Sequence, residues 1–187
     1  MPVSTAADLT AAIARAEPGD LIQLTAGHYV GSWTVRVSGT SDAPIVLCGA
    51  SDAVLDAASI SSRDVITLKA NYWTLGGFTI TGGLRGVYSE RASYNTLERL
   101  TIHDTGQEAV HWRVFSSHNV IRQSTIRSTG LINGEFGEGI YIGQWRGHWA
   151  ATTGGQPDRS DSNSVIDNVI GPAVTAEHVD AKEGTTG

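Results

Sequence analysis

Residues 72–80 read YWTLGGFTI, and the same pattern returns as YNTLERLTI at residues 94–102 and as HNVIRQSTI at residues 118–126. A fourth, weaker copy reads NSVIDNVI at residues 163–170. The regular copies begin about two dozen residues apart, a period typical of stacked supersecondary units rather than of one globular core. Each copy follows the motif apolar-x-x-apolar-x-Ile and lacks the long 3.6-residue stripe of a helical repeat, so short strands are expected.

Short strands separated by Gly, Ser, Asn and Asp predict an all-β fold, a right-handed parallel β-helix of about six turns. The regular rungs occupy residues 65–130, where a second strand of each turn is expected at 65–68, 87–88 and 110–112. Further strands are expected at 21–24, 33–37, 45–47, 54–55, 139–143 and 179–182.

We expect one domain over residues 1–187, with a cap at 1–18, rungs at 19–143, an inserted loop at 144–162 and incomplete last rungs at 163–187. Ser4 or Thr5 can cap a helix that runs to about Ala16. Such a helix would cover the open end of the solenoid, whose terminal rung otherwise exposes apolar side chains and strand edges. The sequence has no matching cap after the last rung, which favours truncation at the C-terminus.

Composition excludes several function classes. The net charge is −6 and no basic run is present, which argues against a nucleic-acid partner. Cys48 is the only cysteine, so neither a disulfide nor a cysteine metal site is expected. No stretch approaches the roughly 20 apolar residues that span a bilayer, and residues 1–20 lack the apolar core of a signal peptide. We favour a secreted chain and leave a cytoplasmic one open.

Two sets of motifs resemble known families. GDLIQL at 19–24, GHYVG at 27–31 and SGTSDAPI at 38–45 resemble the first turn of many pectate-lyase-like β-helix proteins. Later, NGE at 133–135, GIYIG at 139–143 and AEHVDAKEG at 176–184 look like the active-site rungs of the alginate lyase and chondroitinase B family of polysaccharide lyases.

This second resemblance implies a calcium site and a lysine base. Glu177 and Lys182 match the second Glu of the family's Glu-x-Glu motif and its base, whereas Thr175 stands at the first Glu position. Asp180 is the candidate substitute for the missing ligand, and Asn133 matches the Asn of an earlier rung. The family's second catalytic residue, an Arg about one rung further on, would lie beyond residue 187. Pectate lyases with an Asp-rich calcium site are the alternative, with Asp158, Asp161 and Asp167 as counterparts.

Lyases of this kind cleave an acidic polysaccharide such as alginate, pectate or a glycosaminoglycan by β-elimination. A cation that neutralises the uronate carboxylate stabilises the charge that develops when the C5 proton is removed. Lys182 can accept that proton if its pKa is lowered toward neutrality. Because calcium takes six to eight oxygen ligands, substrate or water would complete a shell begun by Glu177, Asp180 and Asn133. Candidate substrate-binding residues are Tyr141, Trp145, Trp149 and His178.

Each candidate also has a structural interpretation. Trp145 and Trp149 can stack on sugar rings or fold the insertion onto the helix. His178 and His111 are more typically satisfied by a turn carbonyl, and Asn95, Asn119 and Asn163 by stacked amides that bond successive turns. Glu135 and Glu138 are a weaker hint of paired-carboxylate hydrolysis. A non-catalytic carbohydrate-binding or structural β-helix is the rival function, because fold alone supports both. The oligomeric state is left open.

Overall fold

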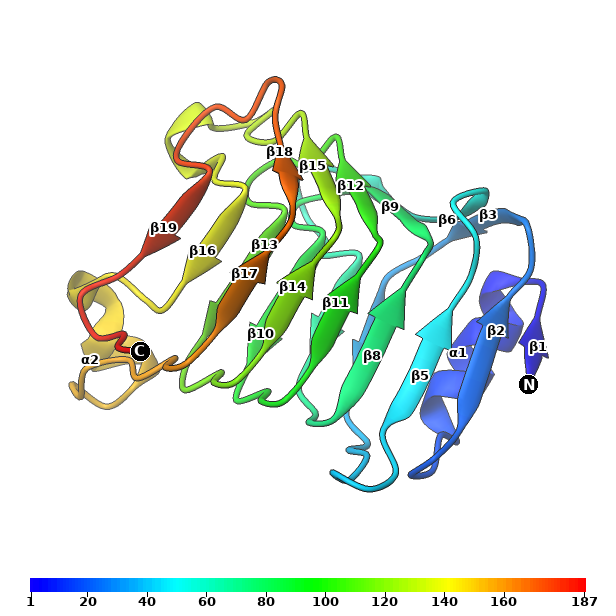
Figure 1. The fold of residues 1–187 in the computed structure, drawn as a ribbon. Coiled ribbons are helices and arrows are strands. Elements are labelled where there is room, and N and C mark those ends of the chain that lie inside the picture. The colour runs from blue at the N-terminus through cyan, green and yellow to red at the C-terminus, as the bar shows by residue number, and fades with distance from the viewer.

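The computed structural model describes residues 1–187 as a right-handed parallel β-helix, with an N-terminal helix at one end (Figure 1). Each coil supplies one strand to each of three parallel sheets. Sheet 1 contains β1 (Pro2–Val3), β2 (Leu21–Leu24), β5 (Ile45–Cys48), β8 (Trp73–Gly76), β11 (Thr96–Glu98), β14 (Val120–Arg122) and β17 (Ser164–Ile166). Sheet 2 contains β3 (Gly27–Val30), β6 (Ala53–Ser59), β9 (Thr79–Gly83), β12 (Thr101–His103), β15 (Thr125–Arg127) and β18 (Val169–Ile170). Sheet 3 contains β4 (Trp33–Val35), β7 (Ile66–Leu68), β10 (Val87–Glu90), β13 (Val110–Arg113), β16 (Ile140–Ile142) and β19 (Val179–Ala181).

The repeat motif builds the core because its apolar positions stack in register. Leu75 pairs with Leu97 and Leu97 with Ile121 in sheet 1, and all three are fully buried. In sheet 2 the Ile residues at 80, 102 and 126 pair in the same way. Parallel strands bring equivalent residues of successive coils side by side, so one buried column forms at each apolar position. The expected fold class is confirmed.

Buried asparagines join successive coils at the turn that enters sheet 1. Oδ1 of Asn95 accepts a hydrogen bond from Trp73 N, and Oδ1 of Asn119 accepts one from Asn95 N, both at 2.9 Å. Asn163 continues the ladder by accepting from Asn119 N at 2.9 Å. Such ladders satisfy backbone donors that the turn leaves without partners. The interpretation of these residues as structural amides is confirmed.

Helix α1 (Ala6–Ala14) covers the N-terminal end. Thr5 is its N-cap, with Oγ1 accepting a hydrogen bond from Asp8 N at 3.1 Å. Leu9, Ala12 and Ile13 are buried against the first coil. The helix ends at Ala14, two residues before the expected Ala16, because the backbone N–H of Arg15 donates a hydrogen bond to Ala12 O and closes the last turn. No helix in this structure is long and apolar enough to cross a membrane.

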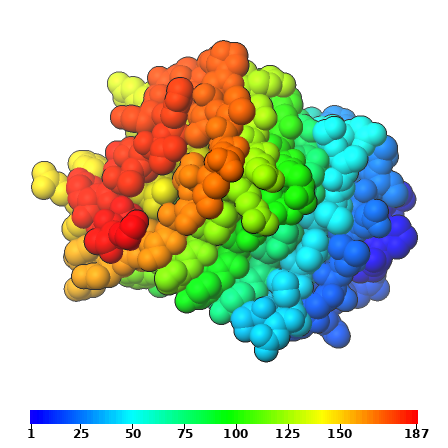
Figure 2. Space-filling model, in the orientation of Figure 1, coloured from blue at the N-terminus to red at the C-terminus, as the bar shows by residue number.

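Two excursions interrupt the coils near β16. The first contains a short 3-10 helix, η1 (Gly134–Phe136), and the second contains η2 (Arg146–His148) followed by α2 (Trp149–Thr152). In the space-filling view the coils follow one another as bands from the blue N-terminal end to the red C-terminal end (Figure 2). The excursions therefore lie beside the last coils, where the predicted site residues are found.

Candidate active site

A cleft of about 510 Å³ lies along the outward face of sheet 3, between the two excursions. It is lined mainly by polar and charged side chains from β10, β13, β16, β19 and the segments around them: Arg85, Gln107, Glu108, His111, Arg113, Glu135, Phe136, Glu138, Tyr141, Gln144, Trp145, His148, Glu177, Asp180 and Lys182.

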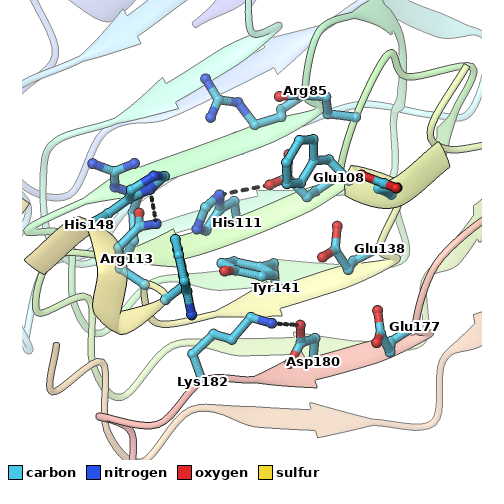
Figure 3. Close-up of a pocket in the computed structure, with 15 residues that line it drawn as sticks. Arg85, Glu108, His111, Arg113, Glu138, Tyr141, His148, Glu177, Asp180 and Lys182 are labelled. Atoms are coloured by element: carbon cyan, nitrogen blue, oxygen red, sulfur yellow. Dashed lines mark hydrogen bonds and ion pairs between the residues drawn. The ribbon is translucent and has the colours of Figure 1, made fainter. Parts of the chain in front are cut away.

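Strand register sorts these residues into columns. Arg85, Glu108, Glu138 and Glu177 each lie two residues before a strand of sheet 3, so they follow one another on adjacent coils (Figure 3). Backbone hydrogen bonds fix this alignment, since Ala109 N donates to Glu138 O at 3.1 Å and Gly139 N to Glu177 O at 3.0 Å. A second column pairs Tyr88, His111, Tyr141 and Asp180. The repeat that forms the core therefore also aligns the cleft residues.

Three carboxylates gather where the columns reach the last coils. One oxygen from each of Glu138, Glu177 and Asp180 lies within 4.8 Å of the others. Glu138 is only 3% exposed, and its Oε2 atom is buried without a hydrogen-bond partner. Burial, with the nearby charges of Glu108, Asp180 and Glu177, raises the pKa of Glu138 to about 7.

Clustered carboxylate oxygens are the ligands that Ca²⁺ prefers. A cation here would neutralise mutual repulsion and give the unpartnered Glu138 oxygen a partner. The residues present therefore fit a hard divalent cation held by three protein side chains, with room in the cleft for water or substrate oxygens to complete the shell.

Lys182 extends over this cluster from the end of β19. Its Nζ atom lies 2.5 Å from Asp180 Oδ2 and 5.0 Å from the centroid of the Tyr141 ring. Burial lowers the pKa of Lys182, but the hydrogen bond and charge of Asp180, with the charges of Glu138 and Glu177, outweigh burial and raise it. A cation on the carboxylates would remove the effects that keep this amine protonated.

His111 and Tyr141 form the floor of the cleft. His111 Nε2 lies 3.1 Å from Gly143 O, and its Nδ1 lies 3.2 Å from Glu108 Oε1. Burial would raise the pKa of Glu108, but the hydrogen bond and charge of His111 outweigh it and lower that pKa. The His111 and Tyr141 rings meet edge to face at 4.3 Å. Burial raises the pKa of the Tyr141 phenol, which therefore keeps its proton.

The structure brings together five of the eight residues to which the resemblance assigned a catalytic, cation-binding or substrate-binding role. Glu177, Asp180, Lys182, Tyr141 and Trp145 line the cleft. The other three lie outside its lining: Asn133, Trp149 and His178.

These three residues have other surroundings. Oδ1 of Asn133 accepts a hydrogen bond from Glu135 N at 3.0 Å and caps η1. Trp149 Nε1 donates to Gln144 O at 2.7 Å and so anchors the second excursion. His178 is exposed. Glu138 takes the third place in the carboxylate cluster, where the sequence suggested Asn133.

The aspartates of the alternative calcium site do not gather. Asp158 is fully buried and accepts hydrogen bonds from Val114 N at 2.7 Å and Phe115 N at 2.8 Å. Asp161 accepts one from Thr186 N at 2.8 Å. These contacts hold turns together, so Asp158 and Asp161 stabilise the fold rather than line the cleft.

Comparison with known proteins first defines the class. The chain belongs to the Pel9A-like right-handed β-helix family, whose model matches residues 2–141. This match confirms the resemblance to pectate-lyase-like β-helix proteins and ends before Glu177, Asp180 and Lys182. No curated protein matches the sequence.

Solved structures then give particular relatives. An alginate lyase from Paenibacillus sp. str. FPU-7 is 39% identical with a TM-score of 0.94, over 99% of this chain and 63% of its own. Pectate lyase Pel9A is 24% identical with a TM-score of 0.68, over 84% of this chain and 40% of its own. A PL6 family polysaccharide lyase from Pseudopedobacter saltans is 18% identical with a TM-score of 0.63, over 98% of this chain and 42% of its own. The last two share the fold alone, and this chain spans less than two thirds of the length of all three.

Proposed function

We propose that this chain forms the catalytic body of a polysaccharide lyase that cleaves a uronate-containing polymer by calcium-assisted β-elimination. The observation that carries the proposal is the cluster of Glu138, Glu177 and Asp180 directly beside Lys182 in an open cleft. The 39% identity to an alginate lyase over nearly the whole chain makes alginate the first polymer to test. A polymeric substrate also favours a secreted protein.

β-Elimination needs a base at C5 and a proton donor at the leaving oxygen. We assign Lys182 as the base, since its unprotonated amine can take the C5 proton. Tyr141 lies beside it and stays protonated, so its phenol can donate a proton to the glycosidic oxygen on C4. The C5–H and C4–O bonds break, and a C4–C5 double bond forms. The electrons of the C–H bond thus end in the new double bond, and the leaving sugar departs with a hydroxyl group.

Glu138, Glu177 and Asp180 would hold the cation. Bound Ca²⁺ would supply charge neutralisation of the uronate carboxylate, which makes the C5 proton more acidic. Trp145 is 49% exposed at the rim, where its ring can stack on a sugar. Arg113 also lines the cleft and can bind a carboxylate.

A non-catalytic carbohydrate-binding module is the second candidate. One observation favours it: Asp180 and its neighbours raise the pKa of Lys182. A protonated lysine binds a carboxylate but cannot accept a proton. The two candidates therefore differ in what Lys182 does once the cation is present.

The test is an ultraviolet assay for the conjugated unsaturated uronate that β-elimination releases. The gene product, expressed to its natural stop codon, is offered alginate, polygalacturonate and chondroitin sulfate with Ca²⁺ or with chelator. We expect activity that chelation abolishes, and a loss of about 10²- to 10⁴-fold in Lys182→Ala.

Lys182→Arg is the discriminating variant because it keeps the positive charge but cannot act as a base at neutral pH. A lyase loses turnover in this variant and keeps its affinity for polymer. Full turnover in Lys182→Arg would refute the assigned base. Polymer binding without any unsaturated product in the wild type would favour the binding module.

A further inference from the structure

A second groove of about 340 Å³ opens beside the cleft, at the C-terminal ends of β7, β10 and β13. Arg113 lines both hollows and therefore joins them. The other residues of this groove come from the same three coils and from α2: Lys69, Glu90, Arg91, Val114, Ala151 and Thr152.

This groove carries excess positive charge in an acidic chain. Its three cations, Lys69, Arg91 and Arg113, face one carboxylate, Glu90, whereas the whole protein has a net charge of −6. Glu90 lies 2.8 Å from Lys69 Nζ and 3.5 Å from Arg113 Nη2. Arg91 is exposed and has no carboxylate partner, and its guanidinium lies 5.6 Å from the centre of the Phe115 ring.

One hydrogen-bond donor of Arg113 also lacks a partner. Its Nε atom is buried and has no hydrogen-bond partner. A donor buried without a partner costs free energy, which an anionic oxygen approaching from the groove would recover. The groove therefore offers one free guanidinium and one partly free guanidinium to an anion.

The strand register of sheet 3 aligns the residues of this groove with Lys182. Lys69, Glu90 and Arg113 occupy one position on successive coils of sheet 3, and Lys182 reaches the same position two coils after Arg113. Arg36 follows β4 at this position on the coil before Lys69. At about 4.8 Å per strand, the backbone of Arg113 lies about 10 Å and that of Lys69 about 19 Å from that of Lys182. Cations thus extend from the cleft along the axis of the β-helix.

We propose that the groove formed by Lys69, Arg91 and Arg113 is an anionic subsite, which binds a carboxylate of the polymer away from the bond that is cleaved. The polymer then lies along the β-helix axis, from the cleft toward the N-terminal coils. The proposal rests on the proposed function for the nature of the polymer, a polyuronate. Planar guanidinium groups suit carboxylates because they donate two parallel hydrogen bonds.

The test compares long and short substrates with Arg91→Gln. Arg127→Gln is the matched control, because Arg127 lies on β15 of sheet 2, forms no ion pair and lines neither hollow. For alginate polymer we expect the KM of Arg91→Gln to rise about five-fold with kcat unchanged. For the shortest oligosaccharide that the enzyme cleaves, which cannot reach the groove, we expect no change. Unchanged KM for polymer, or an equal loss on both substrates, would overturn the proposal.

Retardation in gels that contain alginate or polygalacturonate gives a readout that does not depend on turnover. Weaker retardation of Arg91→Gln than of Arg127→Gln supports the groove even if the wild type releases no unsaturated product, in which case only the lyase assignment fails. Equal retardation of both variants, in a protein that cleaves polymer, overturns the groove alone. A wild type that neither cleaves nor binds any polyuronate overturns both.

Discussion

Glu138→Gln tests the carboxylate cluster through protein stability. Ionised Glu138 is buried among Glu108, Glu177 and Asp180, which raises its pKa from 4.5 to about 7. The folded-state pKa of Glu138 is above its unfolded-state value, so protonation of this carboxyl stabilises the folded protein. This contribution to the free energy of unfolding is fully present below pH 4.5 and is lost as the pH rises through about 7. The shift corresponds to at most about 3 kcal/mol in the absence of a cation. The neutral amide that Glu138→Gln introduces removes this penalty.

The assay is urea unfolding of wild type and Glu138→Gln at pH 5 and pH 8.5 in chelator, followed by fluorescence of the buried Trp73 and Trp112. At pH 8.5 we expect the variant to be more stable than wild type by up to about 3 kcal/mol, and at pH 5 we expect the difference to fall below about 1 kcal/mol. Calcium at one hundred times its Kd should stabilise wild type by about 2.7 kcal/mol and the variant by much less. Glu135→Gln is the control, since this exposed carboxylate lines the same cleft outside the cluster.

Two results would refute this reasoning. If Glu138→Gln is less stable than wild type at pH 8.5 in chelator, the buried carboxylate is not repelled by its neighbours. If calcium stabilises Glu138→Gln as much as wild type, the cation does not bind at this cluster.

Three further substitutions probe the fold, the rim of the cleft and the second excursion. Asn119→Ala should lower the free energy of unfolding in urea by about 2–4 kcal/mol, because it leaves the buried Asn95 N and Ala92 O without partners. A loss below about 1 kcal/mol would contradict the stabilising role of the asparagine ladder. Trp145→Ala should raise the KM for alginate about three- to ten-fold at unchanged kcat, since it removes an exposed stacking surface. An unchanged KM in Trp145→Ala would exclude stacking at the rim. Trp149→Ala should instead lower the melting temperature, because it removes the hydrogen bond that anchors the second excursion.

The sequence predicted the fold well because the repeat encodes the core directly. Each inward position of one coil contacts the same position of the next, so Leu75, Leu97 and Ile121 recur both in sequence and in space. Strand ends were less predictable. The expected strand at 54–55 extends to β6 at residues 53–59, and the one at 33–37 is shortened to residues 33–35. Backbone hydrogen bonds to neighbouring coils set these ends, and local sequence does not specify them.

The cleft was only partly predictable. Glu177, Asp180 and Lys182 lie close together in sequence, so the family resemblance could single them out. The sequence offered Glu138 only as a weak hint of hydrolysis and not as a cation ligand, because the two excursions lengthen the coils and hide its equivalence to Glu177, although both lie two residues before a strand. The shared position, two residues before a strand of sheet 3, was the signal in the sequence that could have identified Glu138 as the equivalent of Glu177. Asn133 was expected near the cation, but its amide caps the adjacent 3-10 helix, a local hydrogen bond that competes with any ligand role.

The register that stacks equivalent side chains on successive coils is energetically unfavourable in the cleft. At some other outward positions the repeat aligns side chains that attract, such as the Tyr72 and Tyr94 rings, which stack at 5.0 Å with an interplanar angle of 6°. On sheet 3 the same register aligns Glu108, Glu138 and Glu177, and like charges at neighbouring strand positions repel. The chain keeps this costly column beside Lys182, where a cation would turn the repulsion into attraction. Proteins tolerate such a local conflict with stability mainly at functional sites. Here the aligned like charges include residues to which we assign cation binding.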